Sequence, residues 1–293
     1  MRTLLLIDGN NNAWRAFHKY KGLRNGKHKV SIIFGLPSIL NGLINKFEPS
    51  RIIMVWDGSK SPHRLEVHPE YKGKRKFNPD YEEFNIQKSI TQDFLHLMGI
   101  PQVVRPEVEA DDYIYMLQKI YVRKGYKVII VSSDKDFKQL VSENVSIWDG
   151  VKQKLINHKN IKEVTGFTAR QSIDYLILDG DNSDNIKGYP GMGEKRLAEF
   201  FSKFRSIKQF LDSGEEFRFI KTEKLLEVVK TNTLLINLRY FYNTYLKGKI
   251  KVEYYKGNKK PTFQKEAFLK VCRKYKFNKF QQKPFLKNYE TSN

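Results

Sequence analysis

Three short runs of aliphatic and β-branched residues constrain the fold most, because an aspartate closely follows each of them. The runs cover residues 4–7, 52–56 and 128–131. Runs of this length and composition predict parallel strands that are buried on both faces. Helical patterns lie between them, so the sequence predicts an α/β fold with a central, mostly parallel sheet flanked by helices.

The predicted helices carry apolar residues at intervals of three and four positions. They cover residues 31–46 and 81–98, and Ala110, Ile114, Leu117 and Tyr121 mark the apolar face of another. In α/β sheets of this kind, ligands bind beyond the carboxyl ends of the strands. We therefore expect the acids that follow the three strands to meet at one edge of the sheet.

Nine carboxylates make up the candidate metal site: Asp8, Asp57, Glu109, Asp111, Asp112, Asp134, Asp136, Asp181 and Asp184. Gathered in one place, they would resist ionisation unless cations lay between them. Mg²⁺ is the expected cofactor because it takes oxygen ligands, and Mn²⁺ accepts the same ligands. Two such ions together activate a water and stabilise the leaving oxygen of a phosphodiester.

Each of these acids has a simpler explanation when it is taken alone. Asp8, Asp57 and Asp134 suit the cap of a following helix or turn. Independent caps need not follow all three core strands, and this coincidence favours a shared site. Residues 179–184 invite comparison with a calcium loop, but Asp184 stands where that loop needs glycine, and Pro190 where it needs glutamate.

The charge indicates the class of partner. The chain has 53 Lys and Arg against 32 Asp and Glu, a formal charge of +21. Such an excess favours nucleic acid, because neutralised phosphates release counterions, although a protein from a lysine-rich proteome would look the same. The single cysteine, Cys272, favours a reducing cytoplasm. No apolar run is long enough to span a membrane, so we expect a soluble protein without membrane association.

The chain divides into three expected regions. Residues 1–170 form the metal-binding core, with a charged excursion at about residues 71–88. Residues 171–250 change to a pattern of helix, glycine-rich turn and helix. Residues 251–293 are basic and aromatic; they suit binding of DNA backbone or bases, but Tyr254, Tyr255, Phe277 and Phe280 suit packing equally well.

The order of short motifs resembles the 5′-nuclease family, which includes flap endonucleases, phage 5′ exonucleases and the 5′-nuclease domain of bacterial DNA polymerase I. The resemblance covers about residues 1–211. It depends on the motifs Ile7-Asp8-Gly9-Asn10, Trp56-Asp57-Gly58, Glu70-Tyr71-Lys72-Gly73-Lys74-Arg75, Val108-Glu109-Ala110-Asp111-Asp112, Ser133-Asp134-Lys135-Asp136-Phe137, Gly180-Asp181-Asn182-Ser183-Asp184 and Gly188-Tyr189-Pro190-Gly191-Met192-Gly193. Each motif alone is weak, but the ordered set is specific.

The resemblance implies a fold and a role for each matching residue. It implies a PIN-like nuclease core with a helical arch and a helix-three-turn-helix. The first metal ion would be held by Asp57, Glu109, Asp111 and Asp112 with Asp8 close beside them, and the second by Asp134, Asp136, Asp181 and Asp184. Lys72 and Arg75 would contact the scissile phosphate, Tyr71 would stack on a terminal base, and Gly191, Gly193, Lys195 and Arg196 would bind duplex backbone, with a potassium ion in the turn.

The function implied is that of a Mg²⁺-dependent flap endonuclease and 5′→3′ exonuclease, acting on DNA with 5′ flaps, nicks or ends. The compact length resembles a bacteriophage replication nuclease more than the polymerase-linked form. It implies a monomer in the cytoplasm of a bacterium or an infected bacterial host, working in replication or primer removal. Two alternatives stay open: a ribonuclease of the same fold that acts on RNA–DNA hybrid, and a catalytically silent DNA-binding scaffold.

Overall fold

The computed structural model describes residues 2–73, 79–256 and 260–290. The predicted mostly parallel sheet is confirmed: within the described residues its six strands run in the order β5-β4-β1-β6-β7-β8. The central strand β1 (Arg2–Asp8) lies between β4 (Arg51–Val55) and β6 (Tyr126–Val131). The edge strands are β5 (Gln102–Val103) and β8 (Lys154–Ile156), and only β8 runs antiparallel to its neighbour β7 (Val145–Asp149).

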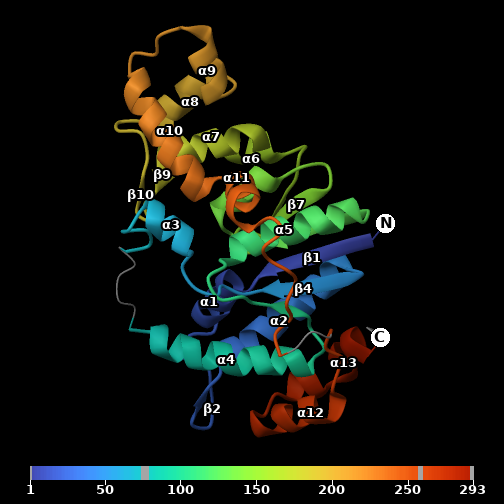
Figure 1. The fold of residues 1–293 in the computed structure, drawn as a ribbon. Coiled ribbons are helices and arrows are strands. Elements are labelled where there is room, and N and C mark those ends of the chain that lie inside the picture. The colour runs from blue at the N-terminus through green and yellow to red at the C-terminus, as the bar shows by residue number, and fades with distance from the viewer. Residues whose placement is uncertain (1, 74–78, 257–259, 291–293) are drawn as a thin grey trace.

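Alternate residues of β1 face opposite sides of the sheet, and both sides are covered by helices (Figure 1). Leu5 and Ile7 pack with the helices α1 (Gly9–Lys19), α2 (Ser31–Phe47) and α4 (Tyr81–Leu97). Leu4 and Leu6 pack with α5 (Ala110–Arg123) on the other side. Burial on both faces explains why the strands are continuous apolar runs.

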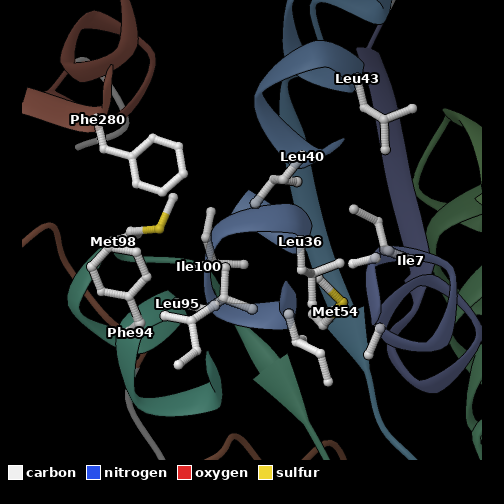
Figure 2. Packing of buried hydrophobic residues seen from close by; sticks show 14 of the residues in the cluster. Ile7, Leu36, Leu40, Leu43, Met54, Phe94, Leu95, Met98, Ile100 and Phe280 are labelled. Carbon is white, nitrogen blue, oxygen red and sulfur yellow. The ribbon is translucent and has the colours of Figure 1, made fainter. Parts of the chain in front are cut away.

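The last part of the chain folds back onto the α4 side of the sheet. It contains α12 (Lys265–Lys274), η3 (Asn278–Gln281) and α13 (Lys283–Glu290). Phe268 stacks on Phe94 of α4 with ring centres 4.9 Å apart, and Figure 2 shows Phe280 over Phe94 and Met98. Phe277 and Phe280 are thus core residues, which explains their place in an otherwise polar segment.

A smaller group of helices lies beyond one end of the sheet, around its own apolar cluster. It begins with α7 (Ala169–Asp179) and continues through the hairpin of β9 (Gly180–Asp181) and β10 (Ile186–Lys187). The helices α8 (Glu194–Lys203), α9 (Ile207–Ser213) and α10 (Thr222–Ile236) follow. Helix, turn and helix therefore occur where the sequence predicts them.

The remaining described elements are short and connect the larger ones. They are β2 (Arg24–Asn25), β3 (His28–Lys29), α3 (Pro62–Val67), η1 (Lys135–Leu140), α6 (Ile161–Thr165), α11 (Leu238–Phe241) and η2 (Tyr242–Leu246). Within the described ranges, no helix has the length and apolar character needed to cross a bilayer.

Candidate active site

A pocket of about 570 Å³ lies where β1, β4 and β6 end. Seven of the nine candidate carboxylates line it: Asp8, Asp57, Asp111, Asp134, Asp136, Asp181 and Asp184. Asp179, which the sequence analysis did not single out, lines it as well. We call this site the acid pocket. Residues separated by up to 176 positions meet there because parallel strands end at one edge of the sheet.

The acids at the ends of the strands accept hydrogen bonds from backbone N–H groups at the starts of helices. The Asp8 carboxylate caps α1 by accepting from the Asn11 backbone N–H at 3.0 Å, and it also accepts from the Ser132 hydroxyl at 2.9 Å. Asp57 accepts from the Ala110 N–H at 2.8 Å. The helix-capping explanation therefore holds for Asp8, and the same carboxylate still lines the pocket.

The hairpin of β9 and β10 supplies Asp181 and Asp184. One Asp181 oxygen accepts from the Ser183 N–H at 2.7 Å and from the Asp184 N–H at 3.2 Å, so the loop holds this carboxylate in place. Gly180 adopts a left-handed φ of 74°, and a Cβ there would lie 2.3 Å from the Gly188 nitrogen. The tight hairpin thus requires glycine beside the acid.

Burial and mutual repulsion make the acid pocket reluctant to ionise. Burial, followed by the charge of Asp57, raises the pKa of Asp8 to about 7. Burial and the charge of Asp134 raise the pKa of both Asp111 and Asp136 well above the usual range. Asp181 differs: burial opposes its ionisation, but the hydrogen bonds from Ser183 and the charge of Lys135 outweigh this, and its pKa is lowered.

The donor set of the pocket fits hard divalent cations. The buried oxygens Asn10 Oδ1 and Asp136 Oδ1 have no hydrogen-bond partner, and a cation would satisfy them. Among the described residues, no three His, Cys, Asp or Glu side chains converge as the ligand group of one ion. Mg²⁺ keeps several of its waters, so carboxylates that surround it can also hold it through water.

Glu109 and Asp112 lie behind the pocket and not in its lining, and their part in binding the first ion stays a prediction. Asp112 is fully buried, and its two oxygens accept from Arg64 at 2.7 and 2.9 Å. Glu109 accepts from the Ser61 N–H at 3.2 Å, and its Oε2 lies 3.5 Å from Arg64. Arg64 therefore offsets the charge of both acids, although at Asp112 burial outweighs this effect and raises the pKa of the carboxyl.

Arg64 joins the core to the helices beyond the sheet, a role that sequence reasoning missed. Its Nε donates to the Leu235 carbonyl of α10 at 3.1 Å, and its guanidinium lies 3.9 Å from the centre of the Phe241 ring. Burial opposes its charge, but Asp112 and then Tyr71 and Glu109 raise the pKa of Arg64 well above its usual value. The interacting residues Arg64, Tyr71, Lys72, Glu109 and Asp112 form what we call the buried charge cluster.

Tyr71 belongs to this cluster and not to an exposed excursion. Its side chain is 2% exposed, and its hydroxyl lies 2.9 Å from Glu109 Oε2 and 3.1 Å from Asp184 Oδ2. The ring packs with Leu176, Ile186 and Leu235. The ring is therefore covered in this structure, and its stacking on a terminal base stays a prediction.

Lys72 belongs to both regions, since it lines the acid pocket and bonds to the cluster behind it. Its Nζ lies 2.7 Å from Glu109 Oε2 and 3.7 Å from Asp184 Oδ2. Its backbone has a φ of 53°, a left-handed value that lysine seldom adopts, and its N–H donates to the Asp184 carbonyl. Arg75, the second predicted cation, lies outside the described residues.

One wall of the acid pocket comes from residues that the sequence analysis did not single out. Trp14 of α1 stacks on Phe84 of α4 with ring centres 3.9 Å apart, and Tyr81 lies beside them, 56% exposed. Asn85 and Lys88 of α4 complete this wall. Lys135 lines the pocket opposite the hairpin acids, with its Nζ 3.5 Å from Asp181 Oδ2.

The predicted backbone-binding residues lie apart from the pocket lining, at the start of α8. Arg196 donates to the Gly191 carbonyl at 2.7 Å, and its guanidinium lies 4.0 Å from the centre of the Phe219 ring. Gly191 has a φ of 77°, which glycine adopts without strain. Gly193 precedes α8 as its N-cap, and Lys195 is exposed. Arg196 therefore holds the turn, whereas Lys195 is open to solvent.

Comparisons with known proteins identify relatives. The family model described as "5′-3′ exonuclease, N-terminal resolvase-like domain" matches residues 3–166. The 5′-3′ exonuclease of Aquifex aeolicus (strain VF5) is 32% identical over 219 residues, which are 74% of this chain and 75% of that protein. DNA polymerase I of Mycobacterium tuberculosis (strain ATCC 25618 / H37Rv) is 34% identical over 230 residues, or 74% of this chain and 24% of that protein.

The chain thus matches about a quarter of the length of this polymerase I. Among solved structures, the T5 5′-exonuclease with divalent zinc ions bound superposes with a TM-score of 0.69. It is 25% identical, and the alignment covers 82% of this chain and 91% of that chain.

Proposed function

The chain belongs to the 5′-3′ exonuclease family, and from this premise we propose that it hydrolyses DNA phosphodiesters as a structure-specific 5′ nuclease. Its substrates are DNA with 5′ flaps, nicks or ends. The observation that carries the proposal is the convergence of seven carboxylates on one pocket at the carboxyl edge of the sheet. Gathering so many buried carboxylates in one place has a clear purpose only if cations and a phosphate enter the pocket.

The proposed cofactor is a pair of Mg²⁺ ions, with Mn²⁺ as a substitute. Asp8, Asp57 and Asp111 would surround the first ion, with Glu109 and Asp112 behind them, and Asp134, Asp136, Asp181 and Asp184 would surround the second, in part through waters that the ions retain. When bound, the two ions supply an activated water and stabilise the leaving oxygen. The T5 relative with divalent zinc ions bound supports a metal site in this fold.

Lys72 is the proposed contact to the scissile phosphate. Its ammonium is already in the pocket, but Glu109 holds it at 2.7 Å. A phosphate entering the pocket competes with Glu109 for this ammonium, and the cation then stabilises charge that develops on the phosphate oxygens. Arg75 would act beside it.

The pocket wall gives the unpaired strand a place to lie. Tyr81 is exposed at the rim and Trp14 lies beside it, so these rings take over the stacking role expected of Tyr71. Stacking of bases on aromatic rings tolerates any sequence, which suits an enzyme that recognises DNA structure. The terminal nucleotides would unpair before they reach the acids.

The duplex is proposed to bind at the turn between α7 and α8. The backbone at Gly191 and Gly193 allows close approach of a phosphate, and the exposed Lys195 adds charge at the start of α8. A potassium ion on the backbone carbonyls of this turn is part of the proposal. A role in replication and primer removal, by a monomer, is also part of the proposal, and the similarity to a DNA polymerase I supports the link to replication.

The test is cleavage of end-labelled 5′-flap, nicked and blunt duplexes with Mg²⁺, Ca²⁺ or EDTA, with the cut mapped to the nucleotide. The proposal expects Mg²⁺-dependent cleavage near the flap junction that EDTA abolishes. An RNA–DNA hybrid in the same series distinguishes the ribonuclease alternative. Binding to all substrates without a cut in any of them would contradict the proposal and favour a scaffold.

A further inference from the structure

Four residues of α4 form a stripe along the acid pocket. Tyr81, Phe84, Asn85 and Lys88 are spaced three and four positions apart, which puts them on one face of the helix, and all four line the pocket. Tyr81 and Lys88 are separated by seven residues, or about 10 Å along the helix axis. A single strand passing along α4 would therefore meet an exposed ring at one end and an ammonium group at the other.

Lys88 differs from the other lysines of the pocket. Lys72 forms an ion pair with Glu109, and Lys135 lies 3.5 Å from an oxygen of Asp181. Among the described residues, Lys88 makes no ion pair and no hydrogen bond through its side chain; its Nζ lies 5.4 Å from the centre of the Trp56 ring. Burial lowers the pKa of Lys88, and the charge of Asp57 opposes that effect.

A role as the structural counter-ion of Asp57 is the simpler explanation of Lys88. However, both oxygens of Asp57 already have donors, from Asn10 Nδ2 at 2.6 Å and from the Ala110 N–H at 2.8 Å. Lys88 is not within ion-pair distance of either oxygen in the described structure. A partly buried ammonium without an anionic partner is unfavourable, so its position indicates that the anion arrives with the substrate.

We propose that Lys88 binds a phosphodiester of the unpaired strand, next to the one that is cut, and so fixes the strand along α4. This inference rests on the proposed nuclease function. It assigns Lys88 a phosphate contact distinct from that of Lys72, which lies in the segment before α4. Lys88 and Tyr81 together form one binding subsite for a nucleotide, with a charged and a stacking part.

The test combines variants with substrates that lack one charge. Lys88→Met removes the ammonium but keeps the apolar stem, and Lys88→Arg keeps the charge. Lys119→Met is a matched control, because Lys119 also lies over aromatic rings, 5.9 Å from that of Tyr115 and 5.5 Å from that of Tyr242, but not in the pocket lining. A series of 5′-flap duplexes carries one uncharged methylphosphonate at successive positions around the cut.

Dissociation constants in Ca²⁺ and single-turnover cleavage rates in Mg²⁺ are measured for every pair of protein and DNA. We expect Lys88→Met to weaken binding of unmodified DNA about tenfold, as for one lost hydrogen bond to a charged group. One methylphosphonate position should weaken binding of the wild type equally, and the variant should show no further loss there. Lys88→Arg should restore most of the sensitivity, and Lys119→Met should retain all of it.

Additive losses at every position would overturn the proposal, because they would show that Lys88 touches no phosphate. A Lys88→Met variant with a lower melting temperature and an equal loss on every DNA would also overturn it, in favour of a structural role. If the wild type leaves all DNA intact in Mg²⁺, the proposed nuclease function fails, while the dissociation constants still decide the role of Lys88.

Discussion

Asp111 and Asp112 are adjacent on α5, yet they lie in opposite kinds of environment. Asp111 lines the acid pocket, where burial and the charge of Asp134 raise its pKa well above the usual range. Asp112 faces the buried charge cluster, where Arg64 donates to both of its oxygens. Neighbouring residues on a helix point about 100° apart, so one dipeptide supplies both regions.

The two environments differ in whether the protein supplies the cations that balance the buried carboxylates. The buried charge cluster is balanced by its own arginine and lysine, and burial of Glu109 is outweighed by Arg64 and Lys72, which lower its pKa. In the acid pocket, Lys72 and Lys135 offset only part of the carboxylate charge, at a cost to stability. Active sites often have this cost, because groups that repel one another in the free protein are needed to bind the ligand.

Arg64→Leu removes the arginine that balances the buried charge cluster, and it should have the largest effect on stability. It leaves Asp112 buried without its cation, and we expect a loss of about 3–5 kcal/mol in the free energy of unfolding. Urea denaturation measures it. The double variant Arg64→Leu with Asp112→Leu should recover part of the loss, because an apolar pair needs no charge balance. A loss below about 1 kcal/mol would contradict the role assigned to this pair.

Asp136→Asn removes one negative charge from the acid pocket. We expect cleavage to fall about 100-fold or more, the scale seen when one charge-stabilising group leaves an active site. The melting temperature in EDTA should stay constant or rise, because a repelling carboxylate is gone. Asp149→Asn is the control: Asp149 is also buried, but it caps the turn at Val151 and lies outside the pocket. That variant should keep its activity.

The metal-free protein should lose stability as the pH rises from 5 to 7. The folded pKa of Asp8 is raised to about 7, so the unfolded chain ionises first and the folded state holds the proton longer. Stability should fall by about 1 kcal/mol for each pH unit in this window and level off above it. Thermal melts in EDTA measure the slope, and saturating Mg²⁺ should reduce it. A stability that increases with pH in EDTA would disprove the assignment.

Tyr81 and Tyr71 give the finest test, because one lies in each region. Tyr81→Leu should weaken binding of a 5′-flap duplex about tenfold by removing a stacking surface, while binding of a plain duplex is unchanged. Tyr71→Leu should lower stability without this selectivity, because it loses hydrogen bonds in the buried charge cluster. Fluorescence anisotropy with both DNAs measures the ratio. A selective loss in Tyr71→Leu alone would restore Tyr71 as the stacking residue.

The sequence predicts the sheet and the pocket well, but it does not predict which acids line the pocket and which pair with Arg64. Apolar strands followed by Asp8, Asp57 and Asp134 carry a local signal, because strand ends at one sheet edge must converge. The pairing of Asp112 with Arg64 joins residues 48 positions apart, and no local pattern announces it. Asp111 and Asp112 have the same chemistry, so only the rotation of α5 tells them apart.

The wall of α4 shows a second limit of sequence reasoning. The helix itself was predicted for residues 81–98, and the structure has it at Tyr81–Leu97. Its start was interpreted as part of a polar excursion, because Glu82, Glu83 and Asn85 dominate the pattern. The contact of Phe84 with Trp14, 70 positions away, turns that start toward the pocket. Tertiary contacts of this kind override local polarity.

The segment of α12, η3 and α13, which packs against α4, also determines when the wall of the acid pocket can form. Ribosomes release the amino-terminal residues first, and early segments generally fold before late ones. Phe94 of α4 packs against Phe268 and Phe280, and the ribosome adds these partners more than 170 residues later. Until then the outer face of α4 stays uncovered, so the helix that carries the pocket wall is covered only after the segment that contains Phe280 has been synthesised.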